Sequence, residues 1–152
     1  MRIAMMVIRL IWKVPYYLLG IWWCGKSSKI SFEESFQFVK KVTKSANHAG
    51  RVTIETHGLE NIPKEDGFIF YPNHQGLFDV LMFFYSSPKP FAFVIKKEAK
   101  NVILLKQAIQ ATGSLPMDRE DLRQSMQVIN QVAKEVQQGR NYIIFAEGTR
   151  SK

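Results

Sequence analysis

Short apolar runs alternate with helical patterns along most of the chain. The runs that we expect to form strands are residues 52–56, 68–71, 91–95, 115–117 and 141–146. The stretches with the length and apolar spacing of helices are residues 77–85, 98–111 and 121–138. Strands that alternate with helices are typical of an α/β fold, so the pattern predicts a mixed, largely parallel sheet flanked by helices.

Polar residues and glycines mark the ends of these predicted helices. Asp121 has the side chain of a helix N-cap, and Gly113 and Gly139 each follow a helical stretch at a place where glycine commonly ends a helix. In the last helix, five apolar residues fall on one stripe, which is the pattern of a face that packs on a core. These residues are Leu122, Met126, Ile129, Ala133 and Val136.

Residues 3–24 are the most apolar part of the chain, but Arg9, Lys13 and Pro15 interrupt them. The uncharged run that remains is shorter than the roughly 20 apolar residues that cross a bilayer. Tryptophans mixed with cations are typical of a helix that lies in the headgroup region of a membrane. We therefore expect a membrane-docking helix here and a second one over residues 32–44. The alternative is that both helices simply pack on the rest of the protein.

The chain has a surplus of positive charge, with 21 Lys and Arg against 13 Asp and Glu and a formal net charge of +8. This surplus favours an anionic partner, which can be nucleic acid, an acidic membrane or a phosphorylated substrate. Five cations and no acid precede Glu33, set among aromatic residues, and this mixture fits lipid headgroups better than a DNA groove. We expect a membrane surface as partner and no nucleic acid. The five cations are Arg2, Arg9, Lys13, Lys26 and Lys29.

The patterns divide the chain into an N-terminal interfacial helical segment, residues 1–45, and an α/β domain, residues 46–152. The last predicted strand has no helix after it to cover it, so we expect the domain to be truncated at its C-terminus. Cys24 is the single cysteine, which excludes an intrachain disulfide and fits a reducing compartment. We interpret it as an inert packing thiol.

A histidine and an aspartate follow the predicted strand 68–71. His74 and Asp79 would face different ways on one regular helix, but they meet if His74 lies in a loop, Gly76 allows a turn and Asp79 begins a helix. The carboxylate would then orient the imidazole as a general base. One histidine and one aspartate are too few ligands for zinc, and no G-x-S-x-G elbow is present. We expect no metal, and no direct role for His48 or His57.

A second polar cluster, residues 147–150, follows the predicted strand 141–146. Arg150 offers a planar fork that suits phosphate, Gly148 permits close backbone approach, and Glu147 can orient the arginine or a hydroxyl. Arg119 is a second candidate phosphate ligand. The alternative is that Arg150 pairs with Glu147, and Arg119 with Asp118 or Glu120, as ordinary surface charges.

Together these residues resemble the glycerolipid acyltransferase family, typified by 1-acyl-sn-glycerol-3-phosphate acyltransferase. Asn73, His74 and Asp79 match its N-H-x4-D block, and residues 113–119 match a block that ends in Asp-Arg, with Lys97 upstream. Residues 145–151 match the F-P-E-G-T-R-S block, with Ala146 in place of the proline. The resemblance covers residues 50–152. The family's fourth block would lie beyond Lys152, and the N-terminal helices resemble the membrane-docking segment in character.

This resemblance implies transfer of an acyl group from acyl-CoA or acyl carrier protein to the hydroxyl of lysophosphatidic acid, without a cofactor. His74 would be the base and Asp79 its partner. The protein would be held peripherally or monotopically on the cytoplasmic face of the cell membrane. The alternative is a truncated, inactive relative that only binds anionic lipid. The residues that would bind the acceptor are Asn73, Arg119, Glu147, Gly148, Thr149 and Arg150.

Overall fold

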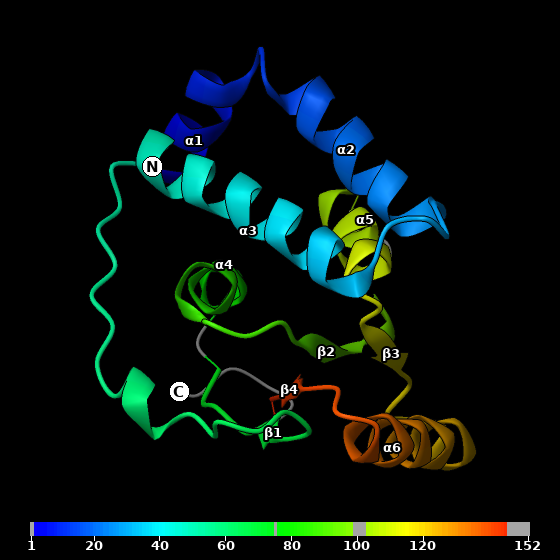
Figure 1. Ribbon diagram of the computed structural model, residues 1–152. Coiled ribbons are helices and arrows are strands. Elements are labelled where there is room, and N and C mark those ends of the chain that lie inside the picture. The colour runs from blue at the N-terminus through cyan, green and yellow to red at the C-terminus, as the bar shows by residue number, and fades with distance from the viewer. Residues whose placement is uncertain (1, 75, 99–102, 146–152) are drawn as a thin grey trace.

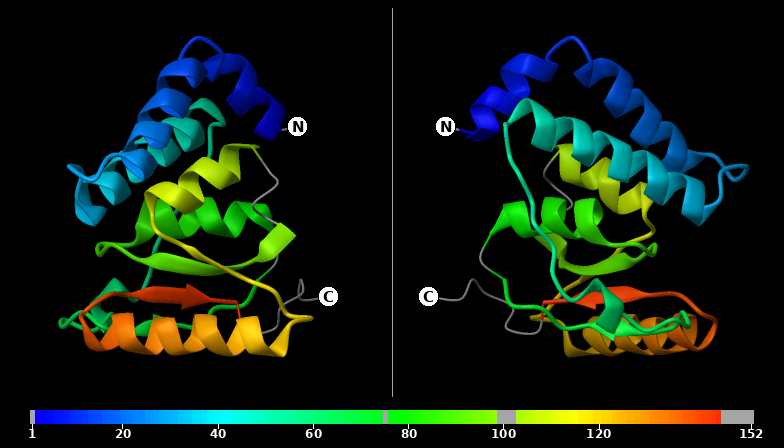
Figure 2. Two further views of the ribbon diagram at one scale, coloured as in Figure 1. Left: turned by 90° about the vertical axis from the view of Figure 1, so that its right-hand side faces the viewer. Right: turned by 60° about the vertical axis from the view of Figure 1, so that its left-hand side comes forward.

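A sheet lies between two layers of helices in the computed structural model of the protein (Figure 1). The structure describes residues 2–74, 76–98 and 103–145. Helices α1 to α5 cover one face of the sheet and α6 covers the other (Figure 2), which confirms the predicted α/β class. The helices are α1 (Arg2–Leu10), α2 (Val14–Lys26), α3 (Phe32–Ala49), α4 (Leu77–Ser86), α5 (Ile103–Ala111) and α6 (Leu122–Gln137). The strands are β1 (Ile69–Phe70), β2 (Ala92–Lys96), β3 (Leu115–Met117) and β4 (Tyr142–Ile144).

The strands of the described residues run in the order β1-β4-β2-β3, and all three pairings are parallel. A parallel sheet collects the carboxyl ends of its strands at one edge, and in open α/β sheets ligands bind at this edge. The last strand in sequence, β4, is inserted between β1 and β2. The segments that follow β1 and β4 are therefore neighbours, although more than 70 residues separate them.

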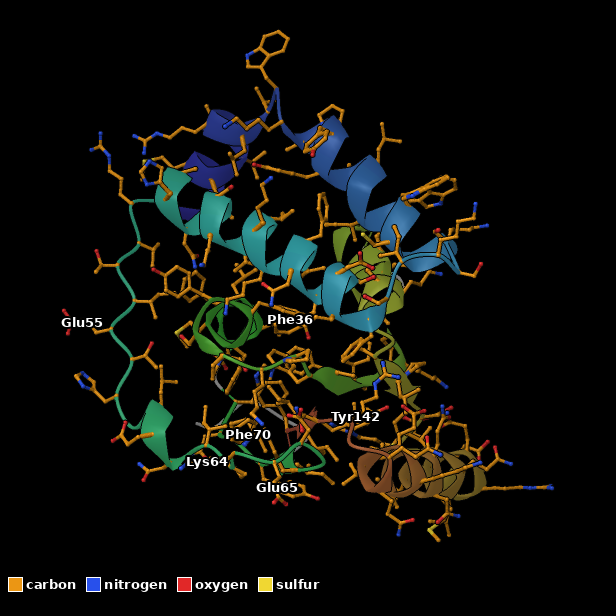
Figure 3. All side chains as sticks on the ribbon, viewed as in Figure 1. Phe36, Glu55, Lys64, Glu65, Phe70 and Tyr142 are labelled. Carbon is orange, nitrogen blue, oxygen red and sulfur yellow. The ribbon has the colours of Figure 1, made fainter. Side chains whose placement is uncertain are left out.

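Alternate residues of the central strands pack into two separate cores, because successive side chains of a strand point to opposite faces. Phe93 and Ile143 pack with helix residues in the first core, which includes Ile21 of α2 and Phe36 of α3. Figure 3 shows Phe36 between α3 and the sheet, and its side chain is fully buried. The second core lies against α6 and consists of Ala92, Val94, Val128, Val132 and Tyr142.

The predicted inward stripe of α6 is wrong. Val128 and Val132 are the buried residues of this helix, whereas Leu122, Met126 and Ile129 are 78%, 54% and 42% exposed. Both stripes have helical spacing and lie about 100° apart, so periodicity alone does not choose between them. The ends of α6 do agree with the sequence. Asp121 caps it by accepting a hydrogen bond from the Gln124 N–H at 3.0 Å.

The predicted strand over residues 52–56 is also wrong, because this segment is an irregular connection that runs from α3 to β1 along one side of the molecule (Figure 1). Its alternating pattern gives alternate partial burial, but no neighbouring strand pairs with it among the described residues. Figure 3 shows Glu55 at the outer side of this connection. A β-branched run becomes a strand only where the fold supplies a partner.

The single interfacial helix expected over residues 3–24 is instead two helices, α1 and α2, bent by 94° at their junction. Pro15 lies in the first turn of α2, where a proline is tolerated because its missing N–H needs no partner. Gly25 lets α2 approach α5 closely, since a Cβ at this position would meet the Ala111 backbone nitrogen at 3.2 Å. Cys24 packs against the first core, and burial raises the pKa of its thiol, which agrees with an inert packing role.

α3 extends to Ala49, five residues beyond the expected end, and so includes residues 45 and 46, at the predicted division of the chain. Ser31 and Glu34 begin it with a capping box, in which the Ser31 Oγ accepts from the Glu34 N–H at 3.2 Å and Glu34 accepts from the Ser31 N–H at 2.8 Å. The division at residues 45 and 46 stays a prediction.

The outer surface of α1 and α2 is apolar. Among the described helices, none is by itself both long and apolar enough to cross a membrane; α1 and α2 reach that length and composition only as a bent pair. Their inward residues, such as Tyr17 and Ile21, are buried, so the helices do pack on the protein. Their outward residues remain exposed: Val7, Ile8, Ile11, Trp12, Tyr16, Leu19, Trp22 and Trp23.

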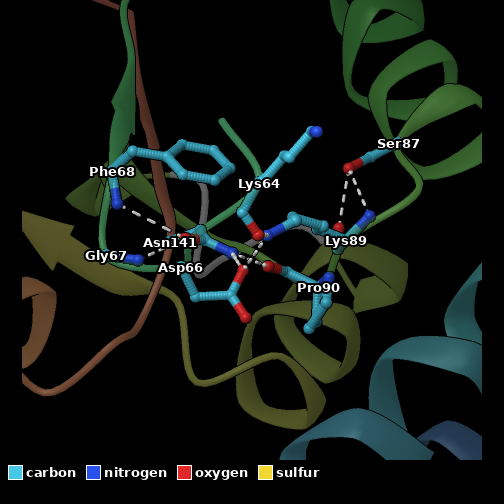
Figure 4. Close-up of polar contacts among 8 residues, drawn as sticks. All are labelled: Lys64, Asp66, Gly67, Phe68, Ser87, Lys89, Pro90 and Asn141. Atoms are coloured by element: carbon cyan, nitrogen blue, oxygen red, sulfur yellow. Dashed lines mark hydrogen bonds and ion pairs between the residues drawn. The ribbon is translucent and has the colours of Figure 1, made fainter. Parts of the chain in front are cut away.

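Asn141 joins three strands at their amino ends (Figure 4). Its side-chain oxygen accepts hydrogen bonds from the backbone N–H groups of Gly67 at 2.8 Å and Phe68 at 3.3 Å, just before β1. Its amide nitrogen donates to the Pro90 carbonyl at 3.0 Å, just before β2, and to Asp66 at 2.9 Å. Since Asn141 is 2% exposed, one buried side chain holds the amino ends of β1, β2 and β4 together.

Candidate active site

The carboxyl edge of the sheet carries the candidate catalytic pair. His74 lies in the loop after β1, and Asp79 is in the first turn of α4. The His74 Nδ1 lies 3.0 Å from the Asp79 Oδ2, and the two side chains are 25% and 12% exposed. The expected loop-and-helix geometry of this pair is therefore what the structure has.

A second hydrogen bond holds the Asp79 carboxylate in place beside the His74 Nδ1. Its Oδ2 accepts a second hydrogen bond, from the Gly76 N–H at 3.0 Å, and so caps the helix that carries it. A carboxylate in the first turn is also stabilised by the helix dipole. Asp79 can therefore hold the proton of the imidazole on Nδ1, which leaves Nε2 as the nitrogen that can take a proton from a substrate.

Gly76 lies at the expected turn between His74 and Asp79, as the residue before α4. Its backbone is extended, with φ of 177° and ψ of −179°, and a Cβ at this position would meet nothing within 4 Å. No special backbone freedom is needed here. The reversal between β1 and α4 is instead fixed by the two hydrogen bonds between Gly76 and Asp79, of which the second runs from the Asp79 N–H to the Gly76 carbonyl at 3.1 Å.

Phe145, the residue after β4, packs against the imidazole of His74. Their ring centroids are 4.2 Å apart and their planes differ by 33°. Phe145 in turn stacks on Phe93 of β2 at 5.9 Å and meets the edge of Phe83 of α4 at 6.2 Å. The imidazole is therefore restrained by a carboxylate at one nitrogen and by an aromatic wall along its face.

The sequence gives only a weak signal for this contact, because Phe145 has the character of any buried strand residue. The contact could have been inferred from the position of Phe145 shortly before the polar segment 147–150. The parallel pairing of β1 with β4 brings that position beside the residues after β1. Strand order, which the sequence pattern does not contain, decides the contact.

Two cations lie at the carboxyl ends of the other strands. Lys97 follows β2 and forms an ion pair with Asp118, which follows β3. The hydrogen bond that Lys97 donates to Asp118 is the main cause that lowers the pKa of Asp118. The same hydrogen bond is the main cause that raises the pKa of Lys97. Asp118 thus pairs with Lys97, which the sequence did not predict. Arg119 is exposed next to it.

α6 holds the segment that carries Arg119. The Gln124 side chain accepts from the Asp118 N–H at 2.7 Å and donates to the Pro116 carbonyl at 3.1 Å, and the Ser125 hydroxyl donates to the Asp118 carbonyl at 2.6 Å. The backbone around Arg119 is therefore fixed by the first turn of the helix that follows it.

Strand spacing separates the candidate residues into two groups. Neighbouring strands lie about 4.8 Å apart, so the ends of β1 and β3, three spacings apart in the order β1-β4-β2-β3, are roughly 14 Å from each other. His74 and Arg119 are at these two outer positions, and Asn73 is exposed beside His74. The segment after β4 begins directly next to the His74 loop. Its candidate residues Glu147, Gly148, Thr149 and Arg150 lie outside the described residues.

The two other histidines lie in other elements. His48 is in the last turn of α3, and His57 lies in the connection before Gly58. Among the residues that the structure describes, no group of three His, Cys, Asp or Glu side chains could hold a metal ion.

Comparison with known families gives one match over the part of the chain that contains this site. The family model described as Acyltransferase matches residues 53–152, which is more than half of the chain. The chain belongs to the acyltransferase family. The matched region begins before β1 and includes both the His74–Asp79 pair and the segment after β4.

Curated relatives carry one common description. The chain is 27% identical over 118 residues to a 1-acyl-sn-glycerol-3-phosphate acyltransferase of Borreliella burgdorferi, covering 78% of this chain and 47% of that protein. It is 28% identical over 116 residues to a chloroplastic 1-acyl-sn-glycerol-3-phosphate acyltransferase of Arabidopsis thaliana, covering 76% and 32%. A Helicobacter pylori enzyme of the same description is 31% identical over 80 residues, covering 53% and 34%.

The chain thus spans about half the length, or less, of the curated relatives that it matches. No solved structure matches it significantly.

Proposed function

We propose that the protein transfers a fatty acyl group from a thioester, acyl-CoA or acyl carrier protein, to the free hydroxyl of lysophosphatidic acid, giving phosphatidic acid. The observation that carries the proposal is the 3.0 Å contact between the His74 Nδ1 and Asp79. The described site has a base with an orienting carboxylate, and the acceptor hydroxyl itself serves as the nucleophile. This chemistry needs no cofactor beyond the thioester.

The steps follow from the positions of the two nitrogens. Nε2 of His74 takes the proton from the acceptor hydroxyl while the hydroxyl oxygen forms a bond to the thioester carbonyl carbon. Asp79 stabilises the imidazolium that results. When the carbon–sulfur bond breaks, the thiolate takes the proton back from Nε2, so that an ester and a free thiol are released and His74 is neutral again. General base catalysis of this kind contributes about 10²- to 10⁴-fold in rate.

The acceptor phosphate would be held by side chains at the neighbouring strand ends. Because β4 lies next to β1, Phe145 at the end of β4 contacts the His74 ring, whereas Arg119 follows the outer strand β3. We therefore propose that Glu147, Gly148, Thr149 and Arg150 contact the glycerol phosphate, with Asn73 beside the base. Arg119 and Lys97, farther along the edge, would add positive charge that attracts the phosphate.

The protein would work at a membrane surface, because its acceptor is a lipid. The outward face of α1 and α2 exposes apolar side chains, with Trp12 93% exposed and Ile8 70% exposed. Exposed apolar groups next to cations bind the interface of an anionic membrane. We propose that this face docks peripherally or monotopically on the cytoplasmic side of the cell membrane.

An assay of acyl transfer tests the proposal. The 152-residue chain is supplied with an acyl-CoA or an acyl carrier protein thioester and with lysophosphatidic acid, glycerol 3-phosphate or lysophosphatidylcholine in mixed micelles. We expect lysophosphatidic acid to be acylated at least about tenfold faster than lysophosphatidylcholine, whose choline group screens the phosphate from cations. Equal rates with both acceptors would contradict the acceptor assignment.

A second candidate function is lipid binding without catalysis. It is favoured by the exposed apolar side chains of α1, α2 and the bend between them, which can bind a lipid surface without catalysis. The same assay separates the two candidates, because a lipid-binding relative would sediment with anionic vesicles while leaving the thioester unconsumed.

A further inference from the structure

An open cavity of about 650 Å³ lies between the α1–α2 bend and the last turns of α3. Figure 1 shows the bend above α3, on the side of the helical layer that faces away from the sheet. The cavity shares no lining residue with β1, α4 or the His74 loop, so it is separate from the candidate active site. Its polar lining residues are Arg9, Lys13, Lys44, Ser45, His48 and Arg51.

The lining of this cavity is cationic. It contains four Lys and Arg side chains and a histidine, and no carboxylate is among the described residues that line it. Four like charges repel one another, and an anion that lies between them offsets this repulsion. A volume of this size is also within the usual range of roughly 300 to 1,000 Å³ for small-ligand sites.

Two side chains that line the cavity have hydrogen-bond donors beyond those in the described hydrogen bonds. The Tyr17 hydroxyl donates to the Ser45 Oγ at 3.0 Å, so the Ser45 proton remains to be donated elsewhere. Arg9 gives one guanidinium nitrogen, Nη1, to the Ala49 carbonyl at 2.7 Å, which fixes this side chain at the end of α3. A guanidinium has further N–H groups that can donate to an anion.

Arg51 occupies an unfavourable backbone conformation at the cavity. It follows α3 with a φ of 50°, the only positive φ of a non-glycine residue in the described chain. Such a conformation costs an L-residue energy that glycine would avoid, and strained residues concentrate at ligand-binding sites. An arginine at a position that suits glycine is consistent with a role for its charge.

We propose that this cavity binds the phosphate group of an anionic membrane lipid, at a site distinct from the one that holds the acyl acceptor. The apolar rim decides between a lipid and a soluble phosphate compound. Ile8, Ile11 and Trp12 alternate with Arg9 and Lys13 along the same bend and are exposed. A lipid can place its phosphate among the cations and its acyl chains along these side chains, whereas a soluble phosphate has no acyl chains to contact them.

The inference rests on the membrane docking proposed above and is tested by a matched pair of double variants. Lys13→Gln with Lys44→Gln removes two charges from the cavity, and Lys26→Gln with Lys29→Gln removes two charges from the far end of α2. Sedimentation with phosphatidylcholine vesicles that contain phosphatidylglycerol measures binding. Both double variants lose two positive charges and therefore the same general attraction to the vesicle. Because only the cavity pair also loses contacts with the lipid phosphate, we expect it to bind at least about tenfold more weakly than the control pair.

Two further measurements separate the source of the phosphate from a general charge effect. Inorganic phosphate, followed by NMR, should shift the imidazole signals of His48 but not those of His57, with saturation at far higher concentration than the lipid needs. Arg51→Gly should keep or raise the melting temperature, because it relieves the strained φ, and should still weaken vesicle binding.

The outcomes distinguish this inference from the docking proposal. Equal vesicle binding by the two double variants, or His48 signals that do not respond to phosphate, would overturn the phosphate site and leave docking intact. If the wild-type protein itself fails to bind the vesicles, the docking proposal is what fails, and this site fails with it.

Discussion

The two ends of the parallel sheet differ in what their polar residues bind. At the amino end, Asn141, Asp66 and Lys89 are joined to one another and to the backbone before three strands. At the carboxyl end, the described contact of His74 is one aspartate on the next helix and one aromatic ring. Side chains at the first end stabilise the fold, whereas those at the second end are oriented but still have hydrogen-bonding capacity for a substrate.

This difference indicates that the amino end of the sheet stabilises the fold and that the carboxyl end carries the chemistry. Glu135, Arg140 and Tyr142 form a second network near the same end, in which the Tyr142 hydroxyl donates to Glu135 at 2.6 Å and Arg140 donates to the Thr112 carbonyl at 3.0 Å. Changes at this end should lower stability and leave the rate of transfer alone. Changes at the carboxyl end should do the reverse.

Replacing Asp79 should give a large effect at the carboxyl end. In Asp79→Asn, the neutral amide no longer stabilises the imidazolium that forms when His74 takes the proton, so we expect transfer to slow by about 10³-fold. The amide oxygen can still accept from Gly76 and cap α4, so the melting temperature should change little. Steady-state transfer and thermal unfolding measure the two effects. A large loss of stability with normal specific activity would reverse the comparison.

Asn141→Ala tests the amino end. The change leaves the partly buried N–H groups of Gly67 and Phe68 without an acceptor, and each such loss costs about 1 to 3 kcal/mol, so we expect a destabilisation of about 3 kcal/mol. Denaturant unfolding measures it. Asn130→Ala on the exposed face of α6 is the matched control and should change stability by less than about 0.5 kcal/mol. The rate of transfer per folded molecule should be unchanged in both variants.

Phe145 tests whether the aromatic wall orients the imidazole. In Phe145→Leu, the ring that packs at 4.2 Å from His74 is lost while the residue stays apolar. We expect kcat to fall about tenfold, because a misoriented base costs on the order of 1.4 kcal/mol of the barrier, with KM for the thioester unchanged. Phe145→Tyr keeps the ring and should retain most of kcat. Equal kcat for the Leu variant and the wild type would show that packing does not orient the base.

Glu135 gives the smallest effect, and its sign depends on pH. Burial opposes ionisation, but hydrogen bonds from Tyr142 and Gln131, together with Arg140, lower the pKa of Glu135 below its usual value. A carboxyl with a lowered pKa contributes stability above its unfolded pKa and loses it as the pH falls through the folded pKa. We therefore expect Glu135→Gln to cost about 1 kcal/mol at neutral pH and nothing in strong acid. Urea unfolding at neutral and acidic pH checks this.

Local signals in the sequence predicted the elements that depend on local chemistry. The Asp121 cap, the end of α5 before Gly113, and α4 between Gly76 and Ser87 all lie where the pattern indicates. The contact of His74 with Asp79 was also predictable, since both residues lie within one loop and one helical turn.

Features that depend on strand order or on the choice of packing face were not predictable. The outward face of α6 was taken for the inward one because Leu122 and Ile129 have the same spacing as Val128 and Val132. The contact of Phe145 with His74 follows from β4 lying between β1 and β2. The fourfold bonding of Asn141 likewise needs three strands that are distant in the sequence. In each case the deciding information is tertiary.

Substitution of His74 tests most directly whether an imidazole takes the proton from the lipid hydroxyl. We expect His74→Ala to lower acyl transfer to lysophosphatidic acid by at least about 10³-fold, with vesicle binding and the unfolding midpoint unchanged. The variant that lacks both His74 and Asp79 should be no slower than His74→Ala alone, because the two residues act as one unit. Turnover of the alanine variant within tenfold of the wild type would contradict the mechanism.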